Sequence, residues 1–220
     1  LIVIDYPHVG EVASKGLLQN LDIPQYQSHI LELKKQSVGK SHESYFIDNG
    51  QWALAIDAAS QTACYREDLI GSYPSNWNAL IGLAKNNRVL WPLKPVHAIS
   101  SFYSIYNNIT DHIKPDNREF INIKYGVDTL QMMKVVSDEL DSNCLEMDPI
   151  QVSELMSTQK NFHYCPYLYG FSNYARNNFK EFFLTYCNVL DLSGKGPFGT
   201  HLGGTGIAVS KVSKNIELAI

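Results

Sequence analysis

Apolar and polar residues along the chain form short stretches that alternate between the two-residue period of strands and the 3.6-residue period of helices. The predicted strands are 1–4, 52–58, 62–65, 89–96, 163–168 and 207–209. The predicted helices are 9–18, one that begins at 74–78, 100–109, 127–140, 150–156 and one that opens at 213–217. Because strands and helices alternate, the pattern predicts an α/β fold.

Several of these elements carry more detailed predictions. The opening run 1–4 reads as a buried strand, because all four of its residues are apolar. Pro92 and Pro95 place segment 89–96 at a sheet edge or a strand end, since proline cannot donate to a ladder. Ser75 or Asn76 is expected to cap the helix that follows. Helix 127–140 has one apolar side, formed by Leu130, Met133, Val136 and Leu140.

Length and composition limit the classes of protein to consider. The 220 residues suffice for one large domain or two small ones, and 45% apolar with 18% charged residues is an ordinary globular composition. The net charge of −4 argues against a nucleic-acid partner. No apolar run approaches the ~18 residues of a membrane span. Because the chain begins within an apparent strand and ends within an apparent helix, we expect it to be a segment of a longer protein.

The chain contains no C-x-x-C pair, which argues against zinc-ribbon and thioredoxin-like sites. Four cysteines allow three pairings, and the sequence does not choose among them. Buried free thiols are the favoured interpretation, because free cysteine packs as a small apolar residue. A disulfide is allowed if the protein is exported. The cysteines are Cys64, Cys144, Cys165 and Cys187.

Two glycine-rich segments superficially resemble phosphate-binding loops. Segment 194–199 has the letters G-x-G-x-x-G, but Pro197 lies inside it and no helix pattern follows, so we expect no dinucleotide cofactor. Segment 203–206 lacks the Gly-Lys-Ser/Thr of a P-loop. Its glycines instead indicate a positive φ angle or a close approach to the backbone.

Catalytic and metal sites find little support in the sequence. His163 and Cys165 alternate on a predicted strand, but no further zinc ligands stand out, so we expect no metal. The signatures of common hydrolases are missing. Paired carboxylates of the glycosidase type remain an alternative, since Asp5, Asp57 and Asp68 can meet in space.

Aromatic residues suggest a carbohydrate site, because aromatic faces pack against sugar rings while hydroxyls and carboxylates bond their hydroxyl groups. Four aromatics lie in turn-rich or polar surroundings and are candidates for such contacts: Tyr6, Trp91, Tyr169 and Tyr174. Three others are predicted to fill the core: Phe102, Phe120 and Phe183.

Four segments, taken in order, resemble the family 1 extracellular solute-binding proteins, whose members mostly bind carbohydrates. They are Leu1–Pro7 with Gly16–Asp22, Trp52–Gln61 with Tyr65–Leu69, Tyr164–Arg176, and Gly196–Asn215. The second is similar to the family's A-L-P-I-D strand and Y-R-x-D-L turn, although Ala55 stands at the usual proline. The last is similar to the return strand and the S-K-N helix start.

This resemblance implies a periplasmic-binding-protein-like (type II) fold of two α/β lobes. Lobe one would comprise 1–58 and 200–220, and lobe two 59–199. Ligand would lie in the cleft at the crossover strands, with contacts from both lobes. By position in the motifs, the implied ligand-binding residues are Asp57, Gln61, Tyr169, Asn173, Tyr174, Gly203, Gly204, Thr205, Tyr6, His8 and Arg176.

The implied function is the substrate-binding component of an ABC importer, which captures a carbohydrate or similar solute and presents it to a membrane permease without catalysis or cofactor. We then expect a monomer in the periplasm or outside the cell, with a lipid anchor compatible with this location. The alternatives are a receptor for a phosphorylated polyol, a carbohydrate-active enzyme and, third, an interaction module.

Overall fold

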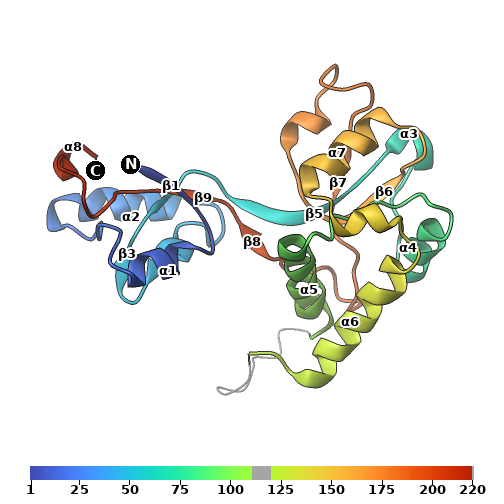
Figure 1. Cartoon of the computed structure of the whole chain (residues 1–220), viewed down its shortest axis with the longest axis horizontal. Coiled ribbons are helices and arrows are strands. Elements are labelled where there is room, and N and C mark those ends of the chain that lie inside the picture. Colours follow the sequence, from blue (N-terminus) through green and yellow to red (C-terminus); the bar gives the residue numbers. More distant parts are fainter. Residues whose placement is uncertain (111–119, 220) are drawn as a thin grey trace. The chain divides into compact units, whose positions relative to one another are not determined.

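The computed structural model describes residues 1–110 and 120–219 and divides the chain into two compact units (Figure 1). Unit 1 comprises Leu1–Ser60 and Leu202–Ile220, and unit 2 comprises Gln61–His201. The chain therefore passes from unit 1 to unit 2 at the Ser60–Gln61 bond and returns at the His201–Leu202 bond. We call these two bonds the crossing points.

Unit 1 is built on a three-stranded antiparallel sheet. Its strands are ordered β1 (Ile2–Asp5), β9 (Thr205–Ala208) and β4 (Leu54–Ala55). Strand β9, which follows the second crossing point, is the middle strand and pairs on both sides. The prediction of a fully buried first strand is wrong. Only Ile4 of β1 is buried, and β1 lies at the end of the strand order, where it pairs with β9.

A short hairpin and several small helices complete unit 1. Strands β2 (Phe46–Ile47) and β3 (Gly50–Gln51) are joined by a two-residue turn with positive φ angles at Asp48 and Asn49, as a type I′ turn requires. The helices are α1 (Val9–Ser14), η1 (Pro24–Tyr26), α2 (Gln27–Gln36), η2 (Glu43–Tyr45) and α8 (Ile216–Ala219).

Two of these helices differ from the sequence prediction. Helix α1 ends before the predicted residue 18, because Gly16 adopts a φ of 66° that stops the helix. Helix α2 was not predicted, and none of its residues is buried. A helix without a buried face leaves little apolar periodicity for the sequence to reveal.

The core of unit 1 lies between the sheet and α1. Val9 and Ala13 of the helix cluster with Ile4 of β1, Ala208 of β9 and Ala53, which directly precedes β4. Tyr45 is buried in the same cluster, which also contains Leu18. This small core fixes the ends of β1, β4 and β9 relative to one another.

Strand β5 (Ala59–Tyr65) is central to the sheet of unit 2, where it lies between β6 (Tyr164–Tyr169) and β7 (Thr185–Cys187). Its first two residues belong to unit 1 and pair with β8 (Leu202–Gly203). The predicted strands 52–58 and 62–65 are therefore placed differently in the structure, which has the short β4 and then one strand from residue 59.

The pairing of β5 with β6 contains a register shift between Thr62 and Cys64. On the opposite strand the shift falls at Pro166, which lacks an N–H and is tolerated at a bulge. Cys64 then lies opposite Cys165, and Tyr65 lies opposite Tyr164.

The helices of unit 2 pack on both faces of this sheet. They are α3 (Glu67–Ile70), α4 (Trp77–Ala84), α5 (Pro95–Ile109), α6 (Ile123–Ser137), η3 (Ser142–Leu145), α7 (Pro149–Thr158) and η4 (Ser172–Ala175). Asn76 caps α4 by accepting from the Ala79 N–H at 3.0 Å, which confirms one of the two predicted caps. Asp148 and Gln151 form a capping box at α7.

The prediction of a strand at 89–96 is wrong. Within it, only Val89 forms a bridge, to Tyr164, and Pro95 begins helix α5. Proline is well suited to a first helical position, because its fixed φ is helical and its missing N–H would have no intrahelical partner there. The predicted helix 100–109 therefore starts one turn earlier.

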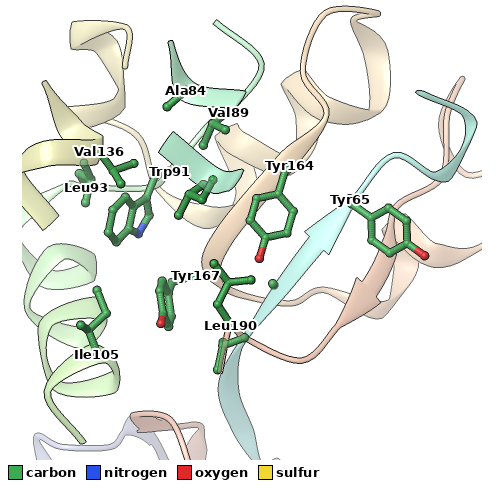
Figure 2. Close-up of a cluster of buried hydrophobic side chains, with 13 residues drawn as sticks. Tyr65, Ala84, Val89, Trp91, Leu93, Ile105, Val136, Tyr164, Tyr167 and Leu190 are labelled. Carbon is green, nitrogen blue, oxygen red and sulfur yellow. The ribbon is translucent and has the colours of Figure 1, made fainter. Parts of the chain in front are cut away.

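Aromatic side chains fill the first core of unit 2, and Figure 2 shows Trp91 and Tyr167 between α5 and the sheet. Their ring centroids are 5.8 Å apart. Trp91 is fully buried, so its predicted role as a sugar-stacking residue is wrong. Conversely, two phenylalanines predicted to fill the core are exposed, Phe120 by 74% and Phe183 by 45%.

A second core lies on the other face of the sheet, because successive residues of a strand point to opposite faces. Ala63 belongs to the first core, and Cys64 belongs to the second with Leu168 and Met156. Helix α6 covers part of the first core through Val136, as predicted. Leu130, predicted for the same side, is 58% exposed instead.

A buried arginine connects three segments of unit 2. Arg66 is completely buried, and two of its nitrogens pair with the Asp68 carboxylate at 2.7 Å each. Its Nη1 donates to the carbonyl groups of Met156 and Gln159 at 2.7 and 2.9 Å. The guanidinium lies 3.8 Å from the Phe182 ring centroid. Each of the three side-chain nitrogens thus has at least one hydrogen-bond partner.

We predict that Arg66→Ala lowers the free energy of unfolding by about 2 to 4 kcal/mol, because it empties a fully buried position and removes the donor of the buried Met156 carbonyl. Urea unfolding followed by circular dichroism measures this change. The matched control is Lys134→Ala, which removes an exposed ion pair with Asp138 and should cost less than about 1 kcal/mol. Equal effects of the two substitutions would contradict the assigned role of Arg66.

Candidate functional site

The first group of candidate residues lies in unit 1, where the loop after β4 meets the start of β9. The Asp57 carboxylate accepts a hydrogen bond from the Thr205 N–H. The Gly204 carbonyl accepts from the Tyr6 N–H at 3.0 Å, so the end of β1 joins the same group. We call Tyr6, Asp57, Gly204 and Thr205 the Asp57 group.

Gly204 is required by this geometry in two ways. Its φ angle is 120°, a backbone conformation that residues with a side chain rarely adopt. A Cβ atom at this position would also lie 2.9 Å from the Asp57 carboxylate oxygen. The sequence prediction that the 203–206 segment needs glycine for backbone conformation and close approach is confirmed here. Gly203, in contrast, lies in strand β8 and pairs with Ala59 of β5.

Tyr6 of the Asp57 group packs edge to face on Tyr45, with ring centroids 6.4 Å apart. Tyr6 is partly buried, whereas His8 is exposed. The Tyr45 hydroxyl is buried and has no hydrogen-bond partner among the described residues. Burial, with a contribution from Asp57, raises the pKa of Tyr45 to about 12, so its hydroxyl stays protonated.

The second group lies in unit 2 around the buried side chain of Gln61. The Gln61 amide donates to the Ser101 hydroxyl at 3.2 Å and accepts from the Ser104 hydroxyl at 2.6 Å. The Trp91 indole N–H also donates to Ser101, at 3.1 Å. Gln61 is therefore fully engaged within unit 2, and its predicted contact with ligand is not supported by this placement.

The hydrogen-bond network around Gln61 also includes residues 200 and 201, which directly precede the second crossing point. The His201 N–H donates to the Ser104 hydroxyl at 2.9 Å, and the Thr200 hydroxyl donates to the Gln61 carbonyl at 2.6 Å. Helix α5 thus contacts both chain segments through one serine. Asn107 and Asn108 extend these contacts to residues 199 and 198.

The His201 ring lies among aromatic side chains. It stacks on Tyr103 at a centroid separation of 5.6 Å, and its Nδ1 is 2.7 Å from the Tyr169 hydroxyl. Tyr103 also contacts the exposed ring of Phe120. We call Tyr103, Tyr169 and His201 the His201 group. All three side chains are partly exposed, and together they carry two phenol hydroxyls and an imidazole.

Tyr174 is not placed with these residues. It is buried in the second core, and its hydroxyl donates to Glu154 at 2.6 Å. Lys180 pairs with the same carboxylate at 2.8 Å. The neighbours Asn173 and Arg176 are exposed on η4 and at its end. The structure therefore brings together only part of the predicted set.

The glycine-rich segment 194–199 has a structural explanation. The Asp191 carboxylate accepts from the N–H groups of Ser193, Gly194 and Gly196 at 2.8 to 3.0 Å. These bonds hold the pKa of Asp191 below its usual value. Gly194 and Gly196 have positive φ angles. The backbone donors that a phosphate would need are thus already used by a carboxylate of the chain itself.

The described residues contain no group of three or more His, Cys, Asp or Glu side chains that could hold a metal ion. Of the carboxylates considered for catalysis, Asp68 is paired with Arg66 in unit 2, whereas Asp5 and Asp57 belong to unit 1. Within residues 1–110 and 120–219, no helix has the length and apolar character to cross a membrane.

Sequence reasoning missed Ser101, Ser104, Asn108 and His201. A signal was present, because Ser100, Ser104 and Asn108 recur every four residues and form a polar stripe along one side of a helix. The prediction concentrated on the aromatic residues of the same helix. His201 had no recognisable motif, and its position depends on the folded return segment.

No family model and no curated protein sequence matches the chain. Solved structures do match it, over 99% of its length. Maltose-bound MalE3 of T. maritima is similar with a TM-score of 0.78 at 13% identity, and 59% of that chain is covered. A solute-binding protein of Agrobacterium radiobacter K84 in complex with ribitol has a TM-score of 0.77 at 17% identity, also with 59% covered.

A third structure, an ABC transporter solute-binding protein of Agrobacterium vitis S4 with bound D-mannitol, has a TM-score of 0.70 at 12% identity, with 56% covered. The chain thus spans about 59% of the length of the first of these structures. At these identities the likeness establishes the fold. The predicted α/β, type II periplasmic-binding-protein fold is confirmed.

We predict that His201 makes stability depend on pH. Burial lowers the pKa of His201, so the unfolded chain takes up a proton at a higher pH than the folded protein. Stability should therefore be full above about pH 6.5 and decline as the pH falls below it. Burial lowers the pKa of His42, His97 and His163 in the same direction.

The measurement is the melting temperature between pH 7.5 and pH 5. His201→Phe should make the decline shallower, whatever its effect at pH 7.5. His29→Phe, at an exposed position of α2, is the matched control and should leave the decline unchanged. A decline of the same steepness in His201→Phe and in the unmodified protein would contradict the prediction.

Proposed function

We propose that this protein is the solute-binding component of an ABC importer and binds a carbohydrate or polyol without chemical conversion. The observation that carries the proposal is the structural likeness over 99% of the chain to binding proteins solved with maltose, ribitol and D-mannitol. These three solutes share rows of neighbouring hydroxyl groups. We further propose membership of the family 1 solute-binding proteins, as the sequence motifs suggest.

We propose that the two units correspond to the two lobes of such a protein, with lobe one formed by 1–58 and 200–220 and lobe two by 59–199. The unit boundaries at residues 60/61 and 201/202 support this division. The whole protein would deliver its solute to a membrane permease from the periplasm or the cell exterior. Delivery requires that the permease distinguishes loaded from empty protein, which a binding-linked change of conformation provides.

The residues near the crossing points are suited to a neutral, hydroxyl-rich solute. The Asp57 group offers a carboxylate and a tyrosine, and the His201 group offers two tyrosines and an imidazole. Neither group contains lysine or arginine. A phosphorylated ligand would need such cations or exposed backbone donors, and the carboxylate of Asp57 would repel it. Tyr103 is a partly exposed aromatic residue of the kind that packs on sugar rings.

Asn173 and Arg176 remain proposed contacts, because both are exposed on unit 2. Gly203 also remains a proposed contact through its backbone, and the exposed His8 remains a weaker one. We leave Gln61 and Tyr174 out of the proposed contact set. Both are buried, with side-chain hydrogen bonds already made inside unit 2. A buried polar group engaged in this way would lose existing bonds if it turned toward a ligand.

We predict that a neutral sugar or polyol raises the melting temperature of the protein, because a ligand that binds only the folded state stabilises it by mass action. Differential scanning fluorimetry against oligosaccharides, monosaccharides, polyols, phosphorylated polyols and amino acids provides the measurement. A shift with neutral hydroxylated solutes alone supports the proposal. A shift only with phosphorylated compounds, or with none of the panel, would contradict it.

We predict that Tyr103→Ala weakens binding of the solute found in this way by about 10-fold or more, because it removes a ring face from the His201 group. Tyr73→Ala is the matched control, since Tyr73 is an exposed aromatic of unit 2 that packs on Tyr65 away from the crossing points. Titration calorimetry compares the dissociation constants. Equal affinities of the two variants would remove Tyr103 from the site.

A pair of substitutions separates the structural and binding roles of Asp57. Asn at this position keeps an oxygen for the Thr205 N–H, whereas Ala does not. We expect Asp57→Asn to retain the melting temperature and lose affinity, and Asp57→Ala to lose both. Full affinity in Asp57→Asn would show that the carboxylate serves only the fold of unit 1.

A further inference from the structure

Strand pairing brings two cysteines of unit 2 together although they are far apart in sequence. Cys64 of β5 lies directly opposite Cys165 of β6, in the same register as the neighbouring pair Tyr65 and Tyr164. Directly opposite residues of antiparallel strands have Cα atoms roughly 4.5 to 5.5 Å apart. Disulfides span Cα separations of about 4.4 to 6.8 Å. The backbone is thus already at disulfide distance.

Both side chains also point to the same side of the sheet. Cys64 and Cys165 are completely buried in the second core of unit 2. The Cys64 sulfur lies 3.9 Å from the Met156 sulfur, which marks the face that α7 covers. Burial raises the pKa of Cys165, and the adjoining Cys64 thiol raises it further. The two thiols are therefore neighbours.

The other two cysteines are placed differently. Cys187 of β7 lies opposite Ala63, and both belong to the first core, on the other face of the sheet. Cys144 lies in the second core, but on η3, outside the ladder of paired strands. Of the six pairs that four cysteines can form, the geometry singles out Cys64–Cys165.

We propose that Cys64 and Cys165 form a cross-strand disulfide when the protein folds in the presence of a small-molecule disulfide such as oxidised glutathione. One cysteine thiolate attacks the glutathione disulfide, which breaks its S–S bond and releases one reduced glutathione. The second thiolate then attacks the protein sulfur of this mixed disulfide and releases the other glutathione. The two cysteines lose two electrons and two protons in total, and one glutathione disulfide becomes two thiols.

Burial determines when the disulfide can form, because both sulfurs are inaccessible once α7 covers the sheet. A thiol that is buried and protonated reacts slowly, since the thiolate is the nucleophile. The bond should therefore form during folding and not in the folded, reduced protein. This proposal is independent of the proposed transport function, because it concerns the core of unit 2.

The test is differential alkylation of the protein after refolding with oxidised glutathione. Free thiols are blocked with iodoacetamide in denaturant, and the sample is then reduced, treated with N-ethylmaleimide and digested with trypsin. Each cysteine falls on its own tryptic peptide: 41–66, 135–160, 161–176 and 181–195. We expect N-ethylmaleimide on Cys64 and Cys165 only, and a linked 41–66/161–176 peptide in an unreduced digest.

Cys144→Ser is the matched control and should leave the linked peptide unchanged. Cys64→Ser should abolish it and leave Cys165 unlinked to any other peptide. The proposal is overturned if refolded protein carries iodoacetamide on both Cys64 and Cys165. It is also overturned if peptide 161–176 is linked to 135–160, or if both cysteines carry separate glutathione adducts. Protein that was folded while reduced should show iodoacetamide on all four cysteines after the same exposure.

Discussion

The arrangement of unit 2 near both crossing points depends on one buried hydroxyl group, that of Ser104. It donates to the Gln61 side chain and accepts from the His201 N–H, so the residues that begin and end unit 2 are bonded to the same turn of α5. Buried polar groups are costly to leave unpaired, and each member of this network satisfies another. The unit 2 residues next to the two crossing points are consequently held in place, and so is His201 beside Tyr103.

A comparable constraint operates in unit 1. There the Asp57 carboxylate bonds the backbone at Thr205, and Gly204 leaves the space that this contact needs. In each unit, therefore, a residue close to the outgoing crossing point bonds the returning segment, Asp57 through its carboxylate and Gln61 through its backbone carbonyl. Polar residues of the two groups are positioned by the fold itself before any ligand is bound, which reduces the entropy cost of binding.

The fold class was predictable from the sequence, because it depends on local motifs and periodicities and on their order along the chain. The motifs around Asp57, Tyr65 and Gly204 occur in sequence order, and alternating periodicity predicted most strands and helices. Burial was harder to predict, since it depends on which elements cover a residue. Trp91 and Tyr174 looked like surface aromatics and are buried, whereas Phe120 looked like a core residue and is exposed.

The candidate site was predictable only in part for the same reason. Asp57 and the glycines beside Thr205 stand in motifs, and their conformational requirements can be read from residue type. His201 and Tyr103 become neighbours only when the return segment lies against α5, and no local pattern encodes that contact. Proline at position 95 was likewise ambiguous, because it suits both a strand end and a helix start.

The central claim is that the protein binds a hydroxyl-rich solute and releases it unchanged. Titration calorimetry of the full-length protein with the stabilising solute, followed by chromatography of the recovered solute, tests it directly. We expect heat with a one-to-one endpoint and complete recovery of the original compound. Conversion of the solute to any product would contradict the account and indicate an enzyme.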